Sequence, residues 1–159
     1  MKVDVDELKG LTDISLPEDV TTTGISQINK ALSQIQANNS KATCLAVEAV
    51  LDLKDKKKKK SVLRTKYEVK RDMLLANDED VKKGKNAAER DATVNGKLKE
   101  EIVDSEKAEI EYNDAQMILS AVEYVLSSQK ATKELTGHQL NVIQKEIDLG
   151  LISPGDVAN

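Results

Sequence analysis

The chain has one histidine, His138, and one cysteine, Cys44, the residue types most often found in catalytic and metal-binding sites. Acid–base or nucleophilic catalysis needs several groups that converge in a pocket, and a zinc site needs about four nitrogen or sulfur ligands. One histidine and one cysteine supply neither set, and no internal disulfide can form. Cys44 falls on an expected apolar helix face, and His138 follows Gly137 near an expected helix end. Structural roles are therefore expected for both.

Carboxylate pairs are the next candidates for chemistry. Glu100 with Asp104, and Glu106 with Glu109, have the spacing that places two side chains on one face of a helix. Long charged helices produce such pairs routinely, and a carboxylate-bridged metal site also needs matching ligands from a second helix. No glycine-rich phosphate-binding motif is present. We therefore expect no metal, no cofactor and no enzymatic activity.

The most informative feature is a basic segment at residues 54–71, which holds ten lysines and arginines against Asp55 and Glu68. On a helix, part of this set shares one flank that could follow a phosphate backbone, and Tyr67 could add a stacking platform for a base. The sequence predicts a single-stranded DNA interface at Lys56, Lys57, Lys60, Arg64, Lys66, Tyr67, Lys70 and Arg71.

Two other interpretations of the basic segment stay open. The lysines could form a solvated helix face, with Tyr67 in an apolar seam between Leu63 and Leu74. Alternatively, the segment could pair with the chain from Lys97 onward, which carries six lysines and twelve acidic residues, either within one chain or between subunits. This pairing competes with nucleic acid for the same cations.

Composition limits the kind of fold that can carry these residues. Charged residues make up 33% of the 159, aromatic residues only 2%, and the formal net charge is -4. Since bulky core-filling side chains are scarce, a compact globule is not expected. The N-terminus lacks an apolar signal core, and no apolar run approaches the length of a membrane span. We expect a soluble cytoplasmic protein without membrane contact.

The apolar spacing predicts an all-α fold built as a long helical hairpin. Residues 1–24 form an acidic arm with a short helix near 5–11. Ile25, Ile28, Leu32 and Ile35 then begin a narrow stripe typical of a coiled coil. A first arm is expected over residues 25–76, with a bend near Asn38, and would be about 75–80 Å long if continuous. Such a rod needs partners.

The chain is expected to turn back at residues 77–96, a charged linker with a helical piece at 87–94 and a helix breaker at residues 95–96. The return arm covers 97–150, and its most apolar part, 115–126, is the expected assembly core. Thr136 and Gly137 are expected to interrupt or cap this helix, and Gly150 to close a short last helix before a flexible tail at 151–159.

This order of parts resembles the phage recombination mediators of the UvsY type, a family of recombination, repair and single-stranded-DNA-binding proteins. The resemblance covers residues 42–135 and lies in the run Lys-Tyr-Glu-Val-Lys-Arg-Asp-Met-Leu at 66–74, in Ala-Thr-Val at 92–94, and in the return helix at 108–129 with its closing segment at 119–131. The acidic N-terminal arm, the five-lysine block and the tail after Gly137 depart from the family pattern.

The resemblance implies a homo-oligomer, in the family a ring, that binds single strands through its basic helix. It also implies contacts with a recombinase and a single-strand-binding protein, with Lys66, Lys70 and Arg71 as the best-matched residues and Arg64 beside them. A single-stranded-DNA-binding recombination mediator is the function expected from the sequence. The alternative is a coiled-coil structural or scaffolding protein of phage assembly with no nucleic-acid role.

Overall fold

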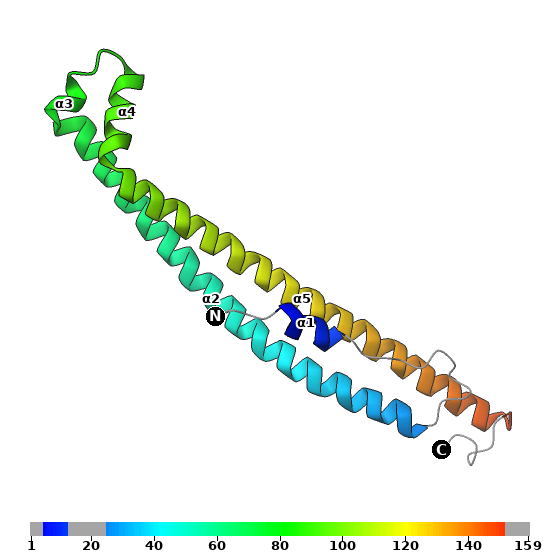
Figure 1. The fold of residues 1–159 in the computed structure, drawn as a ribbon. Helices are drawn as coiled ribbons and strands as arrows, with labels where there is room; N and C mark the ends of the chain where they lie inside the picture. The colour runs from blue at the N-terminus through cyan, green and yellow to red at the C-terminus, as the bar shows by residue number, and fades with distance from the viewer. Residues whose placement is uncertain (1–4, 13–24, 152–159) are drawn as a thin grey trace. The chain divides into compact units, whose positions relative to one another are not determined.

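The computed structural model describes residues 5–12 and 25–151, and within these ranges the chain is helical with no strand. The helices are α1 (Val5–Thr12), α2 (Ile25–Asn77), α3 (Glu79–Lys82), α4 (Ala87–Lys97) and α5 (Lys99–Asp148). The two long helices, of 53 and 50 residues, pack together, and α3 and α4 connect them (Figure 1). This confirms the all-α helical hairpin. None of the helices described combines the length and apolar character that a bilayer crossing needs.

A seven-residue repeat of small and branched side chains forms the seam of the long helix pair. In α2 the residues buried at this interval are Ile28, Ile35, Ala42 and Ala49, and in α5 they are Ala108, Ala115, Val122, Gln129, Thr136 and Ile143. A seven-residue period keeps one face of a helix toward its partner, as in coiled coils. The scarcity of aromatic residues is consistent with this narrow, alanine-rich seam.

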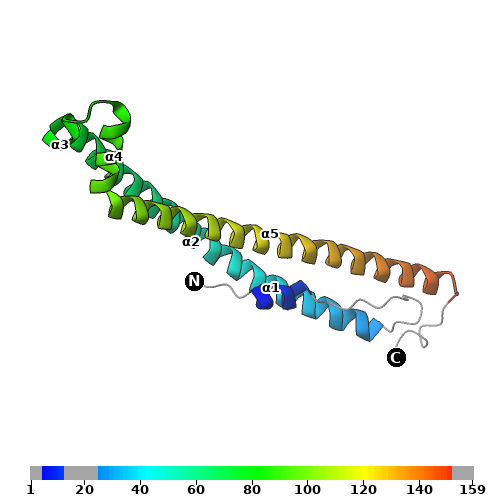
Figure 2. The same ribbon diagram turned by 45° about the horizontal axis from the view of Figure 1, so that its top comes forward.

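The described chain divides into two compact units. The α1 unit comprises Met1–Ala49 with Ile118–Asn159, and the turn unit comprises Val50–Met117. In the α1 unit, Ile28 and Ile143 form one apolar cluster. A second cluster packs Leu8 and Leu11 of α1 on α2 and α5 (Figure 2). The short helix expected near residues 5–11 is thus confirmed, although the rest of the predicted arm lies outside the described residues.

Two side-chain amides attach α1 to the long helices. Asn38 Nδ2 and Gln129 Nε2 both donate to the carbonyl oxygen of Leu11, at 3.3 and 3.1 Å. This carbonyl lies in the last turn of α1, where backbone acceptors have no partner within the helix. Asn38 lies inside a continuous α2, and its side chain supplies a hydrogen-bond donor to the end of α1. Val122 and Val125, from the expected assembly core, pack on α1 within the same chain.

The turn unit ends in two short helices with well-defined caps. The Asp78 side chain accepts hydrogen bonds from the first backbone amides of α3, and the Asn86 side chain accepts one from Glu89 N at the start of α4. Val81, Val94 and Leu98 form the local core. Residues 78–98 thus connect the two long helices.

One predicted helix break is wrong. The break expected at residues 95–96 is close to the observed one, since α4 ends at Lys97 and α5 begins at Lys99, whereas α5 continues through Gly137 to Asp148, so His138 lies within the helix and not at its end. Thr136 beside it is buried in the seam, and its hydroxyl donates to Thr132 O. Burial along the seam offsets the roughly 1 kcal/mol that an interior glycine costs. The chain leaves α5 at Gly150, whose φ of 68° is the left-handed conformation expected of a helix-closing glycine.

Candidate nucleic-acid interface

All eight residues of the predicted interface lie on α2 within the turn unit. They do not share one exposed face. Lys56, Lys60, Tyr67 and Arg71 are half-buried on the side of α2 that meets the returning chain, whereas Lys57, Arg64, Lys66 and Lys70 are exposed. The structure therefore turns half of the predicted set toward the rest of the hairpin.

Glu111 of α5 holds two lysines of the five-lysine block. Its carboxylate lies 3.1 Å from Lys56 Nζ and 2.9 Å from Lys59 Nζ. One turn along α2, Lys60 Nζ lies 2.9 Å from Glu109 and also sits over the ring of Tyr112, 4.9 Å from its centroid. The lysine block is thus bound to the acidic return helix of the same chain.

The same pairing continues toward the turn. Lys70 forms an ion pair with Glu101 of α5, and Arg71 Nη2 lies 3.1 Å from Asp91 of α4. Arg64 pairs within α2 itself, with its Nε 2.9 Å from Glu68, one helical turn away. Five of the eight predicted site residues, Lys56, Lys60, Arg64, Lys70 and Arg71, therefore have a carboxylate partner inside the chain.

The pKa shifts follow these contacts. Hydrogen bonds from Lys59 and Lys56 lower the pKa of the Glu111 carboxyl, and those from Lys60 and Lys70 lower the pKa of Glu109 and of Glu101. The hydrogen bond to Glu111 likewise raises the pKa of Lys56. Exposed ion pairs contribute little stability each. Nevertheless, a cation with a carboxylate beside it attracts a phosphate less than a free one does.

Tyr67 is placed in a seam and not on a platform for bases. It packs with Leu74 and Leu75 against the core of the turn. Its exposed edge lines an open depression of about 290 Å³ with Ile102 and Asn95. This position matches the seam interpretation of Tyr67 and leaves little of the ring for stacking.

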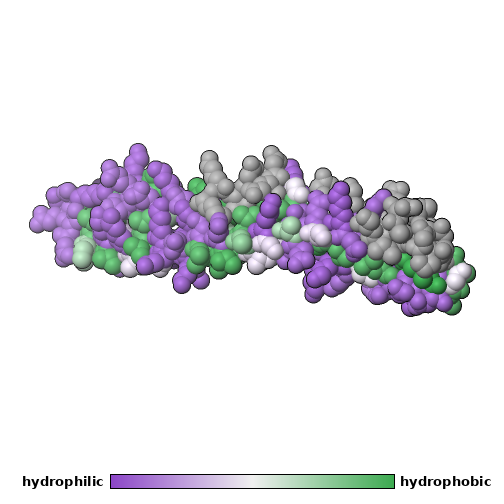
Figure 3. Space-filling model, turned by 90° about the horizontal axis from the view of Figure 1, so that it is seen from below, coloured by the Kyte–Doolittle hydropathy of each residue, from purple (hydrophilic) through white to green (hydrophobic). Residues whose placement is uncertain are grey.

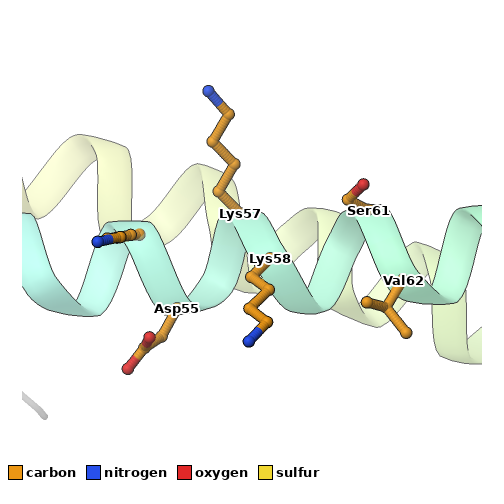
Figure 4. Close-up of a pocket in the computed structure, with 6 residues that line it drawn as sticks. Asp55, Lys57, Lys58, Ser61 and Val62 are labelled. Atoms are coloured by element: carbon orange, nitrogen blue, oxygen red, sulfur yellow. The ribbon is translucent and has the colours of Figure 1, made fainter.

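Lys57 differs from the paired residues because no carboxylate within the described chain lies in contact with it, and the same holds for Lys54 and Lys58. These three lysines line an open depression of about 470 Å³ on the outer side of α2, with Asp55 and Val62. Lys57 and Lys58 extend from the helix in different directions (Figure 4). They leave positive charge at the surface without forming a convergent anion site.

The remaining candidates for chemistry stay apart. Cys44 is a free and exposed thiol, not part of the apolar face on which the sequence placed it. Within residues 5–12 and 25–151, no cluster of three or more histidine, cysteine or acidic side chains has the arrangement of a metal site.

The predicted site did not include Lys59 or the individual carboxylates of α4 and α5 that meet the basic segment. Pairing with the acidic chain after Lys97 was one of the open interpretations, but the sequence alone did not give its register. Once the chain turns at residues 77–96, Glu101, Glu109 and Glu111 reach Lys70, Lys60 and Lys56 in antiparallel order. Comparison with protein families, curated proteins and solved structures gave no match to this chain.

Proposed function

We propose that this chain is a non-enzymatic helical assembly protein, a coiled-coil hairpin that binds further copies of itself through its outer faces. The observation that carries the proposal is that cations of the basic segment form ion pairs with the returning helices. Lys56, Lys59, Lys60 and Lys70 hold α5, and Arg71 holds α4, so half of the ten cations in this segment serve the hairpin itself.

The outer faces support the same proposal. Several large apolar side chains away from the seam are more than half exposed, among them Val62 (58%), Met73 (60%), Ile110 (60%) and Met117 (65%). On the face seen in Figure 3, apolar side chains interrupt the hydrophilic surface at several places. Apolar side chains gathered on a protein surface mark interaction sites. A pair of long helices with such outer faces is suited to bundle formation.

Sedimentation velocity of the full chain over a concentration series tests the proposal. The expected result is a shift from monomer to a discrete larger species, persisting at about 0.5 M salt because apolar contact contributes much of the association. A monomer at every concentration would refute self-assembly.

Single-strand binding is the second candidate, and it is favoured by Lys54, Lys57 and Lys58, which form no ion pair with the described residues. A role in loading a recombinase, which the resemblance implies, depends on such binding. Its test is the fluorescence anisotropy of a labelled single strand with a variant that changes all three lysines to Gln. Changing Lys130 and Lys133 to Gln provides a control on the other unit. Binding lost only in the first variant would favour this candidate.

A further inference from the structure

The outward face of α5 in the turn unit carries a second seven-residue repeat. Val103, Ile110 and Met117 are exposed and lie seven residues apart, and the buried seam residues Ala108 and Ala115 have the same interval. At about 1.5 Å per residue the repeat covers about 21 Å of helix. Since Ala108 lies five residues from Val103, the two repeats fall on opposite sides of the helix. One side of α5 is used inside the hairpin, and the other is open.

The outward face of α2 in the same unit carries an apolar stripe as well. Leu51, Val62, Val69 and Met73 are all exposed. Their separations of eleven, seven and four residues are each close to a whole number of helical turns, so these side chains share one face. The half-buried Leu63 and Tyr67 lie on the other side of the helix, with the seam.

The charges beside the two stripes are opposite in sign. Lys54 and Lys58 lie between Leu51 and Val62 on α2 together with Asp55, which leaves this stretch with a net positive charge, and neither lysine forms an ion pair in the described chain. Glu106 and Asp114 lie beside the stripe of α5, and neither forms an ion pair with the described residues. Both pairs of charges are therefore available to a partner. One face is apolar and basic, and the other is apolar and acidic.

We propose that the outward face of α2 in one copy binds the outward face of α5 in a second copy, with Lys54 and Lys58 facing Glu106 and Asp114. Two basic faces would repel each other, as would two acidic ones, so the contact joins unlike faces. Such a contact leaves one free face on each end copy. Repetition of the contact therefore builds a ring when the rotation between successive copies returns to the first copy, and a filament when it does not. It does not build a simple two-fold dimer. This inference rests on the proposed self-assembly and names its surface.

Charge reversal tests the pairing. One variant carries Lys54→Glu with Lys58→Glu, and the other carries Glu106→Lys with Asp114→Lys. Each variant alone presents two faces of the same sign, so its association is expected to weaken at least about tenfold in sedimentation velocity. Mixed in equal amounts, the two variants restore complementary faces at every contact, and the large species is expected to return.

The controls separate this inference from the proposed function. Glu123→Lys with Glu134→Lys makes the same change in net charge as the Glu106 and Asp114 variant, on exposed positions of α5 in the other unit, and is expected to assemble like the parent. Circular dichroism verifies that every variant keeps its helix content. If the parent assembles and both reversal variants also assemble alone, or if mixing fails to restore assembly, this surface is wrong while self-assembly stands. If the parent stays monomeric, the proposed function fails and this inference fails with it.

Discussion

Replacing Gln129 with leucine is expected to stabilise the hairpin, although it removes a native hydrogen bond. Gln129 occupies a seam position of α5, and its side chain is 1% exposed. Its Nε2 donates to Leu11 O at 3.1 Å, but its Oε1 is buried without a partner. The Leu11 carbonyl also accepts from Asn38 and so keeps one donor in the variant.

Two opposing terms set the magnitude. The lost hydrogen bond costs about 0.5–1.5 kcal/mol, and a buried acceptor without a partner costs about 1–3 kcal/mol while it is present. Leucine removes both the hydrogen bond and the unpartnered acceptor, and it fills a similar volume with apolar atoms, so the expected net stabilisation is about 1 kcal/mol. Gln129→Ala instead leaves a cavity and is expected to lie about 2–5 kcal/mol below the leucine variant.

Urea unfolding followed by far-ultraviolet circular dichroism, at one fixed protein concentration, measures these differences. Adding Asn38→Ala to Gln129→Leu removes the second donor to Leu11 and is expected to release α1, seen as faster amide hydrogen exchange at residues 5–12. If Gln129→Leu alone destabilised the protein by more than about 1 kcal/mol, the claim that the unpartnered Gln129 Oε1 lowers the stability of the native protein would be refuted.

Three further outcomes are expected. The carboxyls of Glu109 and Glu111 have a folded-state pKa below the ordinary value of 4.5, so the stability that they contribute is present above that pH and is lost as the pH falls through the lower folded-state value. Melting curves over a pH series should show this loss of stability, and a variant with Gln at both positions should lose less. Gly84→Ala is expected to lower the melting temperature, because the added Cβ would lie 2.8 Å from Arg90 Cγ and 3.1 Å from its backbone nitrogen; an unchanged melting temperature would contradict the tight turn. Ile143→Ala is expected to cost about 2–5 kcal/mol in urea unfolding, and a cost below about 1 kcal/mol would mean that the Ile28 cluster is not a core.

The sequence predicted the helices better than their ends. The apolar spacing after Ile25 and the absence of proline between residues 18 and 153 were sufficient for two long helices. Gly137 was misread because an interior glycine is a weak local signal, and burial along a seam outweighs it. Predicting that burial requires knowing which residues of the other helix lie opposite.

The same missing information limited the prediction of the site. The cations of α2 were visible in the sequence, but those partners that lie in α5 are 31 to 55 residues away. Only the register of the hairpin brings Glu111 to Lys56 and Glu101 to Lys70. Pairing between the two arms was one of the interpretations left open, and the structure contains it within one chain.

The central claim is that carboxylates of the returning chain occupy the cations of α2. The most direct measurement is the fluorescence anisotropy of a labelled single strand, at about 50 mM salt, with a variant that changes Glu101, Glu109 and Glu111 to Gln. A matched control changes Glu100, Glu123 and Glu134 to Gln, none of which forms an ion pair with the described residues, and alters net charge equally. The account predicts weak binding by the parent and the control, and binding at least about tenfold tighter by the first variant. Tight binding by the parent, unchanged in that variant, would contradict it.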